Sequence, residues 1–411
     1  MELWRRRDGL VTGEPFALSF AIVRNGGRRL GLALLAVILG GCGRTAPPTS
    51  TTASARPSNA APSPTSLFAF PAASGVACPD LASLGLERAL LNAADQNHPD
   101  RRDVVLCDAR DTAHPRSLQA LVGSSSQRFL GRDLIGYVTL KGGGPSSTPD
   151  QFTSVVTTLN LTTGQTAELA STAGAALAAG WSADGLTVAY FTDSGAAHHY
   201  WLKRGRAAPV AFSTTAPVEG RGGSRDDMLL VAFSPDGQYV LVVDTFVYRL
   251  QLFRTSDGTM VYAAPSGGAG GFRTAAVWAH SGDRFYFRNN SGVYQWDSTS
   301  GISSIIPGLT WSTPSLTTDD RLVAYALATT TAPHVETRVI SSGATTAYAP
   351  WRDSPVFVGP TTLLVHEEAP CDNCMGIYSW TGKTLVIHTD TRAESDLGVT
   401  GWQFGAFWPS G

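Results

Sequence analysis

The chain has 411 residues, of which 43% are hydrophobic and 16% are charged, and its formal net charge at pH 7 is −2. This hydrophobic fraction is enough for a folded core and argues against a chain that is disordered throughout. The charge becomes mildly acidic once the arginine-rich residues 1–41 are set aside, and this excludes the strongly basic surface that binds nucleic acid.

Residues 1–41 are expected to be a signal peptide. Two arginines precede the apolar run Leu30–Leu39, which is too short to span a bilayer comfortably and ends in Leu39-Gly40-Gly41-Cys42. This ending resembles a bacterial lipobox, which implies that Cys42 carries a lipid and anchors the protein to the cell membrane. An ordinary signal peptide with a chance cysteine is the alternative. Because the segment before the apolar run is unusually long, the true start is suspected near Val23.

Residues 42–75 are rich in Pro, Ser, Thr and Ala, as in Ala61-Pro62-Ser63-Pro64-Thr65. This composition predicts a disordered tether that holds a globular head away from the membrane, although a spacer of no consequence is an alternative. Residues 76–411 are then the folded domain.

A motif repeated at a spacing of about 45 residues runs through this domain. In chain order, copies begin at Phe129, Gly180, Ala232, Val277, Leu316 and Phe357. The clearest copy is Ala232-Phe233-Ser234-Pro235-Asp236-Gly237, followed by the apolar run up to Val243. Such a copy predicts a strand that ends at an aromatic residue, a tight turn and a second strand.

Polar, glycine-bearing segments follow four of these copies and predict a hairpin between two outer strands. They are Leu159–Gln165, Leu252–Gly258, Gln295–Gly301 and Tyr378–Lys383. Each repeat therefore carries four strands, which predicts an all-β fold, a β-propeller of four-stranded blades.

The last copy, Gly405–Gly411, supplies an inner strand and then stops. Three short strand-like runs before the first complete repeat, Arg88–Leu91, Val104–Cys107 and Leu118–Leu121, can supply the missing outer strands. The two ends of the chain are thus expected to share one blade and to close the ring. Seven blades are predicted, with six as the alternative.

The repeats resemble the PD40, or WD40-like, propeller repeats of TolB-type periplasmic proteins and of the propeller domains in relatives of prolyl oligopeptidase. The resemblance covers nearly all of the folded domain and implies its architecture. It implies little about chemistry, because such propellers serve as binding platforms, enzyme gates and enzymes alike.

Four cysteines remain besides Cys42. Because disulfides persist outside the cytoplasm, we expect Cys78 to pair with Cys107 and Cys371 to pair with Cys374. The segment His366–Cys374 also has the side chains of a metal site. A short-range disulfide is favoured there, so neither a metal nor a cofactor is predicted.

The tryptophans divide into two groups. Trp181, Trp278 and Trp408 occupy or adjoin the aromatic position of the repeat and are expected to pack between blades. Trp311, Trp351 and Trp402 lie nearer the segments that enter inner strands, and they are the candidates for a binding surface or a channel mouth.

No catalytic residues are predicted, since the sequence has neither a Gly-x-Ser-x-Gly nucleophile elbow nor a His-Glu-x-x-His helix. The leading hypothesis is a lipid-anchored extracytoplasmic propeller that acts as a binding or scaffolding module for an envelope protein or glycan. The alternative is an enzyme with its active site over the channel, such as a glycan hydrolase or lyase.

Overall fold

The computed structural model describes most of the chain from Leu67 onwards. The described ranges are 67–93, 103–143, 148–194, 198–215, 229–244, 249–265, 276–282, 284–289, 291–309, 311–327, 332–370 and 378–410. Cys42, Cys371 and Cys374 lie outside them, as do the predicted signal peptide and most of the predicted tether. No described helix is long and apolar enough to cross a membrane.

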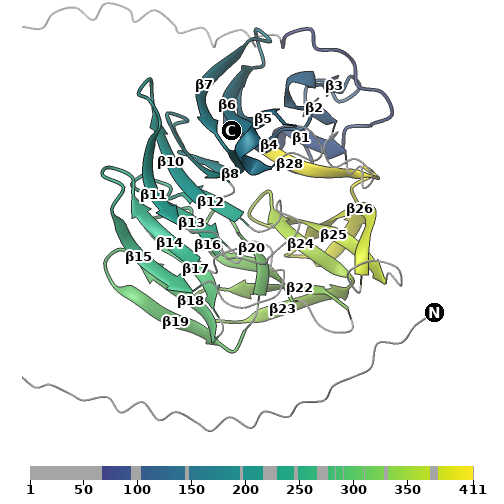
Figure 1. Cartoon of the computed structure of the whole chain (residues 1–411). Helices are drawn as coiled ribbons and strands as arrows, with labels where there is room; N and C mark the ends of the chain where they lie inside the picture. Colours follow the sequence, from purple (N-terminus) through teal and green to yellow (C-terminus); the bar gives the residue numbers. More distant parts are fainter. Residues whose placement is uncertain are drawn as a thin grey trace, which may run out of the picture. The chain divides into compact units, whose positions relative to one another are not determined.

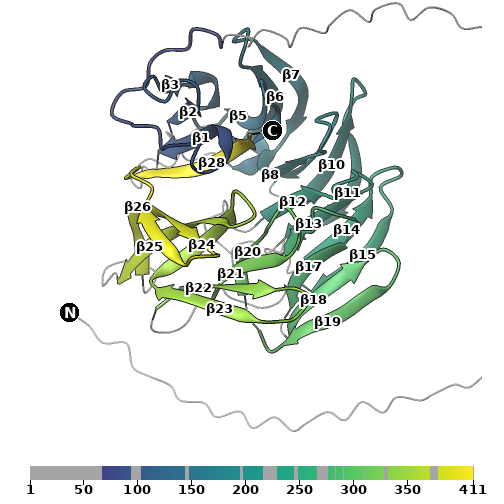
Figure 2. The same ribbon diagram turned by 180° about the vertical axis from the view of Figure 1, so that it is seen from behind.

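Seven antiparallel sheets of four strands each form a ring, so the prediction of a seven-bladed β-propeller is confirmed (Figures 1 and 2). Each blade is given from its inner to its outer strand. Blade 1 has β28 (Trp402–Pro409), β1 (Leu86–Ala93), β2 (Val104–Asp108) and β3 (Arg116–Ser117). Blade 2 has β4 (Ser125–Gly131), β5 (Leu134–Gly142), β6 (Phe152–Asn160) and β7 (Thr166–Ala173).

Blade 3 has β8 (Ala175–Trp181), β9 (Thr187–Asp193), β10 (His198–Arg204) and β11 (Val210–Thr215). Blade 4 has β12 (Leu229–Phe233), β13 (Tyr239–Asp244), β14 (Arg249–Arg254) and β15 (Met260–Pro265). Blade 5 has β16 (Ala276–Trp278), β17 (Arg284–Asn289), β18 (Gly292–Asp297) and β19 (Gly301–Pro307).

Blade 6 has β20 (Trp311–Leu316), β21 (Leu322–Leu327), β22 (His334–Val339) and β23 (Thr345–Pro350). Blade 7 has β24 (Arg352–Phe357), β25 (Thr362–Pro370), β26 (Tyr378–His388) and β27 (Ala393–Asp396). Two short 3-10 turns, η2 (Gln119–Leu121) and η3 (Pro149–Gln151), lie between strands.

The two ends of the domain close the ring in blade 1, as predicted. Strand β28 pairs antiparallel with β1, with Phe407 opposite Ala89, and β1 pairs in turn with β2. In Figure 1 the yellow β28 accordingly lies beside the blue β1. Ser410 donates hydrogen bonds from its backbone N–H and its hydroxyl to the carbonyl of Gly85 (3.0 and 2.9 Å). Hydrogen bonds thus take the place of the covalent turn found in the other blades.

The outermost strand of this blade differs from the prediction. The run Leu118–Leu121 is not a strand, because it enters the turn η2, and the fourth strand is the two-residue β3 just before it. Leu118 and Leu121 are fully buried in the core between blades 1 and 2. These leucines are apolar because they pack beneath the segment that connects blade 1 to blade 2, and not because they belong to a sheet.

The segment 67–75, which the composition places in the tether, lies against the propeller. Ala72 pairs with Arg116 at the edge of β3, and the backbone N–H of Phe68 donates to the carbonyl of Leu161 (2.8 Å). A few residues later, Cys78 forms the predicted disulfide with Cys107 of β2. The start of the described chain is thus fixed to blade 1 by the disulfide and by pairing with β3, and to blade 2 by the hydrogen bond to Leu161.

The repeated motif forms the turn between the first two strands of a blade. In blades 3, 4 and 6 a hydroxyl donates to the aspartate two residues later, at 2.5 Å for Ser182, 2.6 Å for Ser234 and 2.7 Å for Thr317. The same hydroxyl accepts the N–H of the residue that starts the next strand, as at Thr187 (2.9 Å). Gly237 adopts a φ of 71°, which explains the glycine of the motif.

One hairpin prediction is wrong. The segment Tyr378–Lys383 lies within the long strand β26, and the turn to the outermost strand of blade 7 follows at 389–392. Gly382 has a φ of 92° close to a register shift between β25 and β26. The glycine therefore marks an irregularity inside a strand, where a bulge imposes the same backbone requirement as a turn.

A hydrophobic cluster lies between each pair of neighbouring blades, seven clusters in the described part of the chain. Trp181 packs between blades 2 and 3, Trp278 between blades 4 and 5, and Trp408 between blades 1 and 2. The packing predicted for these three tryptophans is confirmed. Because each sheet is covered on both faces by its neighbours, the blades hold one another in place.

Candidate functional site

The topology gives the ring two different faces. The inner strands line the axis of the ring, and β28 contacts β4, β4 contacts β8, β8 contacts β12, β16 contacts β20 and β20 contacts β24. The strands of a blade alternate in direction. The turn that joins its first and second strands therefore lies at the same end as the turn that joins its third and fourth strands, and this end of the ring is here called the turn face. The connections between the second and third strands of a blade, and those from one blade to the next, lie at the other end, here called the loop face.

The connections on the turn face are all short, whereas those on the loop face vary widely in length. On the turn face, only residues 132–133 join β4 to β5 and only 182–186 join β8 to β9. The segments 216–228 and 266–275 join strand ends on the loop face. Long connections carried by a rigid scaffold are where binding residues concentrate.

The inner strands are irregular near the loop face. Residues with positive φ interrupt three of them close to their first residue: Ser126 in β4 (54°), Thr313 in β20 (44°) and Ser354 in β24 (51°). A register shift with the second strand accompanies each one. Bulges with unusual backbone angles re-aim side chains and occur preferentially at rims and binding sites.

Blade 7 carries an extended hairpin at this face. Beyond the residues that pair with β24, strands β25 and β26 continue with Glu368 opposite Trp380, Ala369 opposite Ser379 and Pro370 opposite Tyr378. The hairpin therefore projects past its own inner strand.

Three half-buried tryptophans lie on this hairpin or on backbone segments that are hydrogen-bonded to it or next to such a residue. The carbonyl of Trp351 accepts the N–H of Glu368 (2.9 Å). Trp380 packs on the ring of His366, with centroids 5.2 Å apart, and donates from its indole N–H to the carbonyl of Lys383 (2.7 Å). Trp402 follows Gly401, whose N–H donates to the carbonyl of Gly382 (2.7 Å). We call Trp351, His366, Trp380 and Trp402 the blade 7 aromatic cluster.

Ionic side chains flank this cluster. Glu367 lies 3.8 Å from both Arg352 Nη1 and Lys383 Nζ, and it accepts a hydrogen bond from the Thr381 hydroxyl (3.1 Å). Arg352 also pairs with Glu394 at 2.5 Å. Aromatic faces beside fixed carboxylates and cations suit a polar ligand that has apolar faces and many hydroxyls, such as a sugar.

The structure separates the three tryptophans predicted for a binding surface. Trp351 and Trp402 are half-buried beside the blade 7 hairpin, where Trp402 also packs against the core between blades 7 and 1. Trp311 instead exposes only 1% of its surface and packs on Tyr325 in the core between blades 5 and 6. As the first residue of β20 it faces the neighbouring blade, a direction that its position in the repeat does not reveal.

The contact between the rings of Trp380 and His366 was not predicted from the sequence. They are 14 positions apart and meet only because β25 and β26 pair beyond the blade. The signal available was the segment Tyr378–Lys383 itself, which alternates aromatic and polar residues as a strand with one exposed face does.

Carboxyl groups with a displaced pKa occur elsewhere, on the turn face. Hydrogen bonds from the hydroxyl and backbone of Thr299 and from the backbone of Ser300 lower the pKa of Asp297 to about 2. The Ser182 hydroxyl and the Leu186 N–H hold the pKa of Asp184 below its usual value, and the Thr317 hydroxyl and the Arg321 N–H do so for Asp319. These shifts are accounted for by turn geometry. Among the described residues no three His, Cys, Asp or Glu side chains are grouped to hold a metal ion.

No protein-family model matches the chain, and no curated protein matches its sequence. Solved structures similar to it include TolB from Acinetobacter baumannii, which is 15% identical, with 75% of this chain and 80% of that one covered and a TM-score of 0.41. The C-terminal WD40 domain of Sif2 is 12% identical, with 66% and 71% covered and a TM-score of 0.43. A putative 6-phosphogluconolactonase from Bacteroides fragilis is 13% identical, with 78% and 97% covered and a TM-score of 0.47.

The chain is thus a seven-bladed β-propeller, and the solved structures similar to it include TolB and WD40 propellers. This architecture fits a binding or scaffolding module. None of these likenesses identifies a ligand or an activity of this chain.

Proposed function

We propose that the protein is a lipid-anchored binding module on the extracytoplasmic side of the bacterial cell membrane, and that its loop face binds a glycan of the cell envelope. The observation that carries the glycan proposal is the blade 7 aromatic cluster with the carboxylates and cations beside it. The cluster is built from the blade 7 hairpin and from the chain at the starts of β24 and β28, all carried by rigid blades, so little ordering entropy is lost on binding.

The ligand class follows from the chemistry of the side chains. The rings of Trp351, Trp380 and Trp402 provide apolar, flat contact area that is partly exposed to solvent. Glu367 and Lys383 provide an acceptor and a donor at the same end of the hairpin. A sugar ring offers an apolar face to the first group and hydroxyls to the second.

Sedimentation with insoluble peptidoglycan tests this proposal. The full-length protein is expected to co-sediment, and Trp380→Ala is expected to bind about three- to tenfold more weakly, the usual worth of one aromatic contact. Ile302→Ala is the matched control, because Ile302 is an exposed apolar residue (47%) on the outer strand of blade 5. Equal binding by the wild type and Trp380→Ala would contradict the proposal.

Chemical cross-linking in cells separates a glycan from a protein ligand. If Trp380→Ala abolishes a cross-link to an envelope protein and leaves sedimentation with peptidoglycan unchanged, the cluster is a protein-binding surface and the glycan proposal is wrong.

The lipid anchor has its own test. Metabolic labelling with a fatty acid is expected to label the wild type and not Cys42→Ala, which should also lose membrane association. Labelling of the variant at the wild-type level would exclude Cys42 as the lipidated residue.

A further inference from the structure

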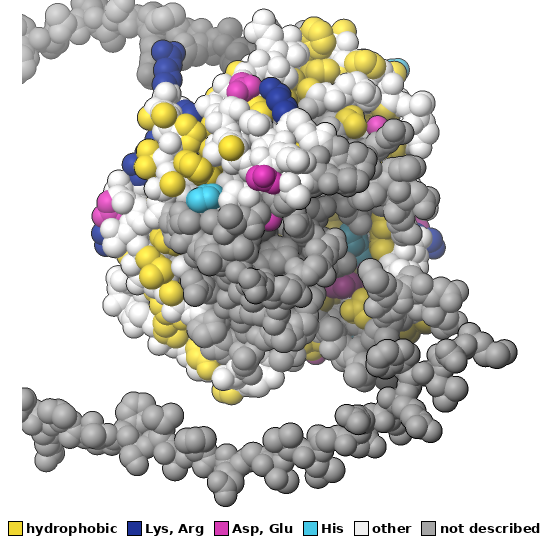
Figure 3. Space-filling view, viewed as in Figure 1, with side chains coloured by type: hydrophobic (Ala, Val, Ile, Leu, Met, Phe, Trp, Pro, Cys, Tyr) yellow, Lys and Arg dark blue, Asp and Glu magenta, His cyan; other side chains and the backbone are white. Residues whose placement is uncertain are grey.

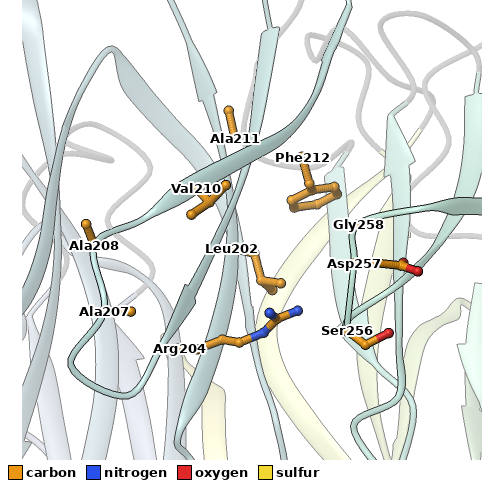
Figure 4. Close-up of a pocket in the computed structure, with 10 residues that line it drawn as sticks. All are labelled: Leu202, Arg204, Ala207, Ala208, Val210, Ala211, Phe212, Ser256, Asp257 and Gly258. Atoms are coloured by element: carbon orange, nitrogen blue, oxygen red, sulfur yellow. The ribbon is translucent and has the colours of Figure 1, made fainter.

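A hollow of about 310 Å³ opens between blades 3 and 4, away from the blade 7 aromatic cluster (Figure 4). One wall is formed by β10, β11 and the turn that joins them, and the other by the turn between β14 and β15. Both turns join third and fourth strands, so the hollow belongs to the turn face. Its volume is at the lower end of the range for ligand sites and suits one or two amino-acid residues.

The inner part of the hollow is apolar and rigid. Leu202 is buried there, and the Phe212 ring packs edge-on against Phe253 of the next blade, with centroids 4.8 Å apart. Val210 at the rim is 64% exposed, an unusual position for a β-branched apolar side chain. Burial of an apolar group of the ligand against these residues would remove that exposed surface from water.

Arg204 is the one cationic side chain among the described residues that line the hollow. Figure 4 shows the guanidinium of Arg204 reaching from the end of β10 toward Ser256 and Asp257. Asp257 already accepts hydrogen bonds from Arg254 Nη1 (3.1 Å) and from the N–H of Thr259 (2.9 Å). Within the described ranges no carboxylate lies within ion-pair distance of Arg204. The guanidinium is therefore available for an anionic group of a ligand.

The strand beside the hollow is an edge strand. Among the described strands, β11 is the last of its sheet and pairs only with β10. An extended peptide can add to such an edge through backbone hydrogen bonds, with alternate side chains facing the neighbouring blade. β11 starts at the turn next to Arg204, so a peptide that runs antiparallel to it ends beside that residue.

We propose that this hollow binds the carboxyl terminus of a polypeptide that ends in an apolar residue. The terminal carboxylate pairs with Arg204, the last side chain fills the space against Leu202 and Phe212, and the preceding residues extend β11. This site lies beyond the glycan-binding function proposed above and does not depend on it.

Calorimetric titration of the full-length protein tests the site with an acetylated pentapeptide that ends in leucine. The free acid is expected to bind about tenfold or more tightly than the same peptide as its C-terminal amide. Arg204→Gln should lose this preference. Arg206→Gln, which removes the same charge two positions away outside the hollow, should keep it.

A second variant tests the hollow without altering charge. Ala208 lies in the exposed turn that forms one wall, so Ala208→Phe is expected to fold normally and to weaken binding about tenfold by filling the space. The proposal is overturned if acid and amide bind alike, if both arginine variants weaken binding equally, or if no saturable binding is found up to about 10 mM. It is also overturned if 4-methylpentanoate, which lacks a peptide backbone, binds as tightly as the pentapeptide.

Discussion

Arg88 is a charged side chain held almost entirely inside the protein, with 1% of its surface exposed. Its Nε lies 2.9 Å from Asp108 of the same blade, and its Nη1 lies 2.5 Å from both Asp133 and the carbonyl of Arg132 in blade 2. This one residue thus joins the closing blade to the next blade along the ring. A buried charge is tolerated because each side of the guanidinium has an acceptor.

Removal of this charge is predicted to be costly. Arg88→Met leaves Asp108 buried without its partner, and the free energy of unfolding should fall by about 3 to 5 kcal/mol. Urea denaturation of the two proteins measures the difference. The control is Arg321→Met, which breaks an exposed ion pair with Asp319 and should change stability by about 0.5 kcal/mol or less. A loss at Arg88 no greater than that of the control would show that the buried network contributes little.

Asp320 joins two neighbouring turns by its carboxylate. It accepts the N–H groups of His280 (2.7 Å) and Ser281 (2.8 Å), as well as the hydroxyl of Ser281. Burial alone would raise its pKa, but the hydrogen bonds from Ser281 and His280 outweigh burial and hold the pKa below the usual value.

A depressed pKa in the folded state makes stability depend on pH in a definite direction. The contribution of Asp320 is complete above the pKa of an unfolded aspartate, about 3.9, and is lost as pH falls through the lower folded pKa. Asp320→Asn should therefore be less stable than the wild type by about 1 to 3 kcal/mol at pH 7, and the difference should shrink near pH 3. Urea denaturation at both pH values checks this. A difference that is the same at both would rule out a role for the charge.

At the scale of elements, neighbouring inner strands approach each other too closely for most side chains at some points. An added Cβ on Gly180 of β8 would lie 2.2 Å from the carbonyl oxygen of Val231 in β12. The glycine has an ordinary φ, so it is required by this contact between blades rather than by its own conformation.

Gly180→Ala is accordingly expected to destabilise the protein by about 1 to 3 kcal/mol, because backbone cannot move aside as a flexible side chain can. Gly131→Ala in the inner strand β4 is the matched control, since its added Cβ would meet nothing within 4 Å. Thermal unfolding of both variants gives the comparison. If Gly131→Ala is destabilised as much as Gly180→Ala, strand entropy and not the blade contact explains the glycine.

At the scale of the whole molecule, stability depends on how the ring is closed. Blade 1 combines the last strand with strands from the start of the domain, and no covalent turn joins β28 to β1. The disulfide between Cys78 and Cys107, 29 residues apart, fixes the start of the domain to the middle of this blade.

Loss of this disulfide is predicted to lower the free energy of unfolding by about 3 to 4 kcal/mol in the chain-entropy model for a loop of this length. The double variant Cys78→Ser, Cys107→Ser should show this loss in urea denaturation. Reduction of the wild type with dithiothreitol should produce a similar shift, and any shift in the double variant should be smaller, because only the predicted Cys371–Cys374 disulfide remains there to be reduced. An unchanged midpoint in both experiments would mean that the noncovalent contacts of blade 1 suffice for closure.

Most of the fold could be predicted from sequence because its determinants are local. The turn at Ser234–Gly237 needs a hydroxyl, an aspartate and a glycine at fixed spacing, and these residues are adjacent in the chain. Predictions from short sequence patterns were wrong where the same residues suit two different local structures. Gly382 was predicted to lie in a hairpin turn, but its positive φ belongs to a bulge within a strand. The leucines of 118–121 were predicted to form a strand, but they are buried under a connection.

The repeat and the sharing of blade 1 by the two ends of the domain could therefore be predicted from the residues alone, since short-range turn chemistry and alternation encode both. The structure selected seven blades over six. The burial of Trp311 and the residues that meet on the loop face became known only from the folded arrangement. The direction of Trp311 into a blade interface and the contact of His366 with Trp380 depend on strand register and on the neighbouring blade. Strand register and the identity of the neighbouring blade depend on pairing between segments that are distant in the chain, so they cannot be inferred from adjacent residues.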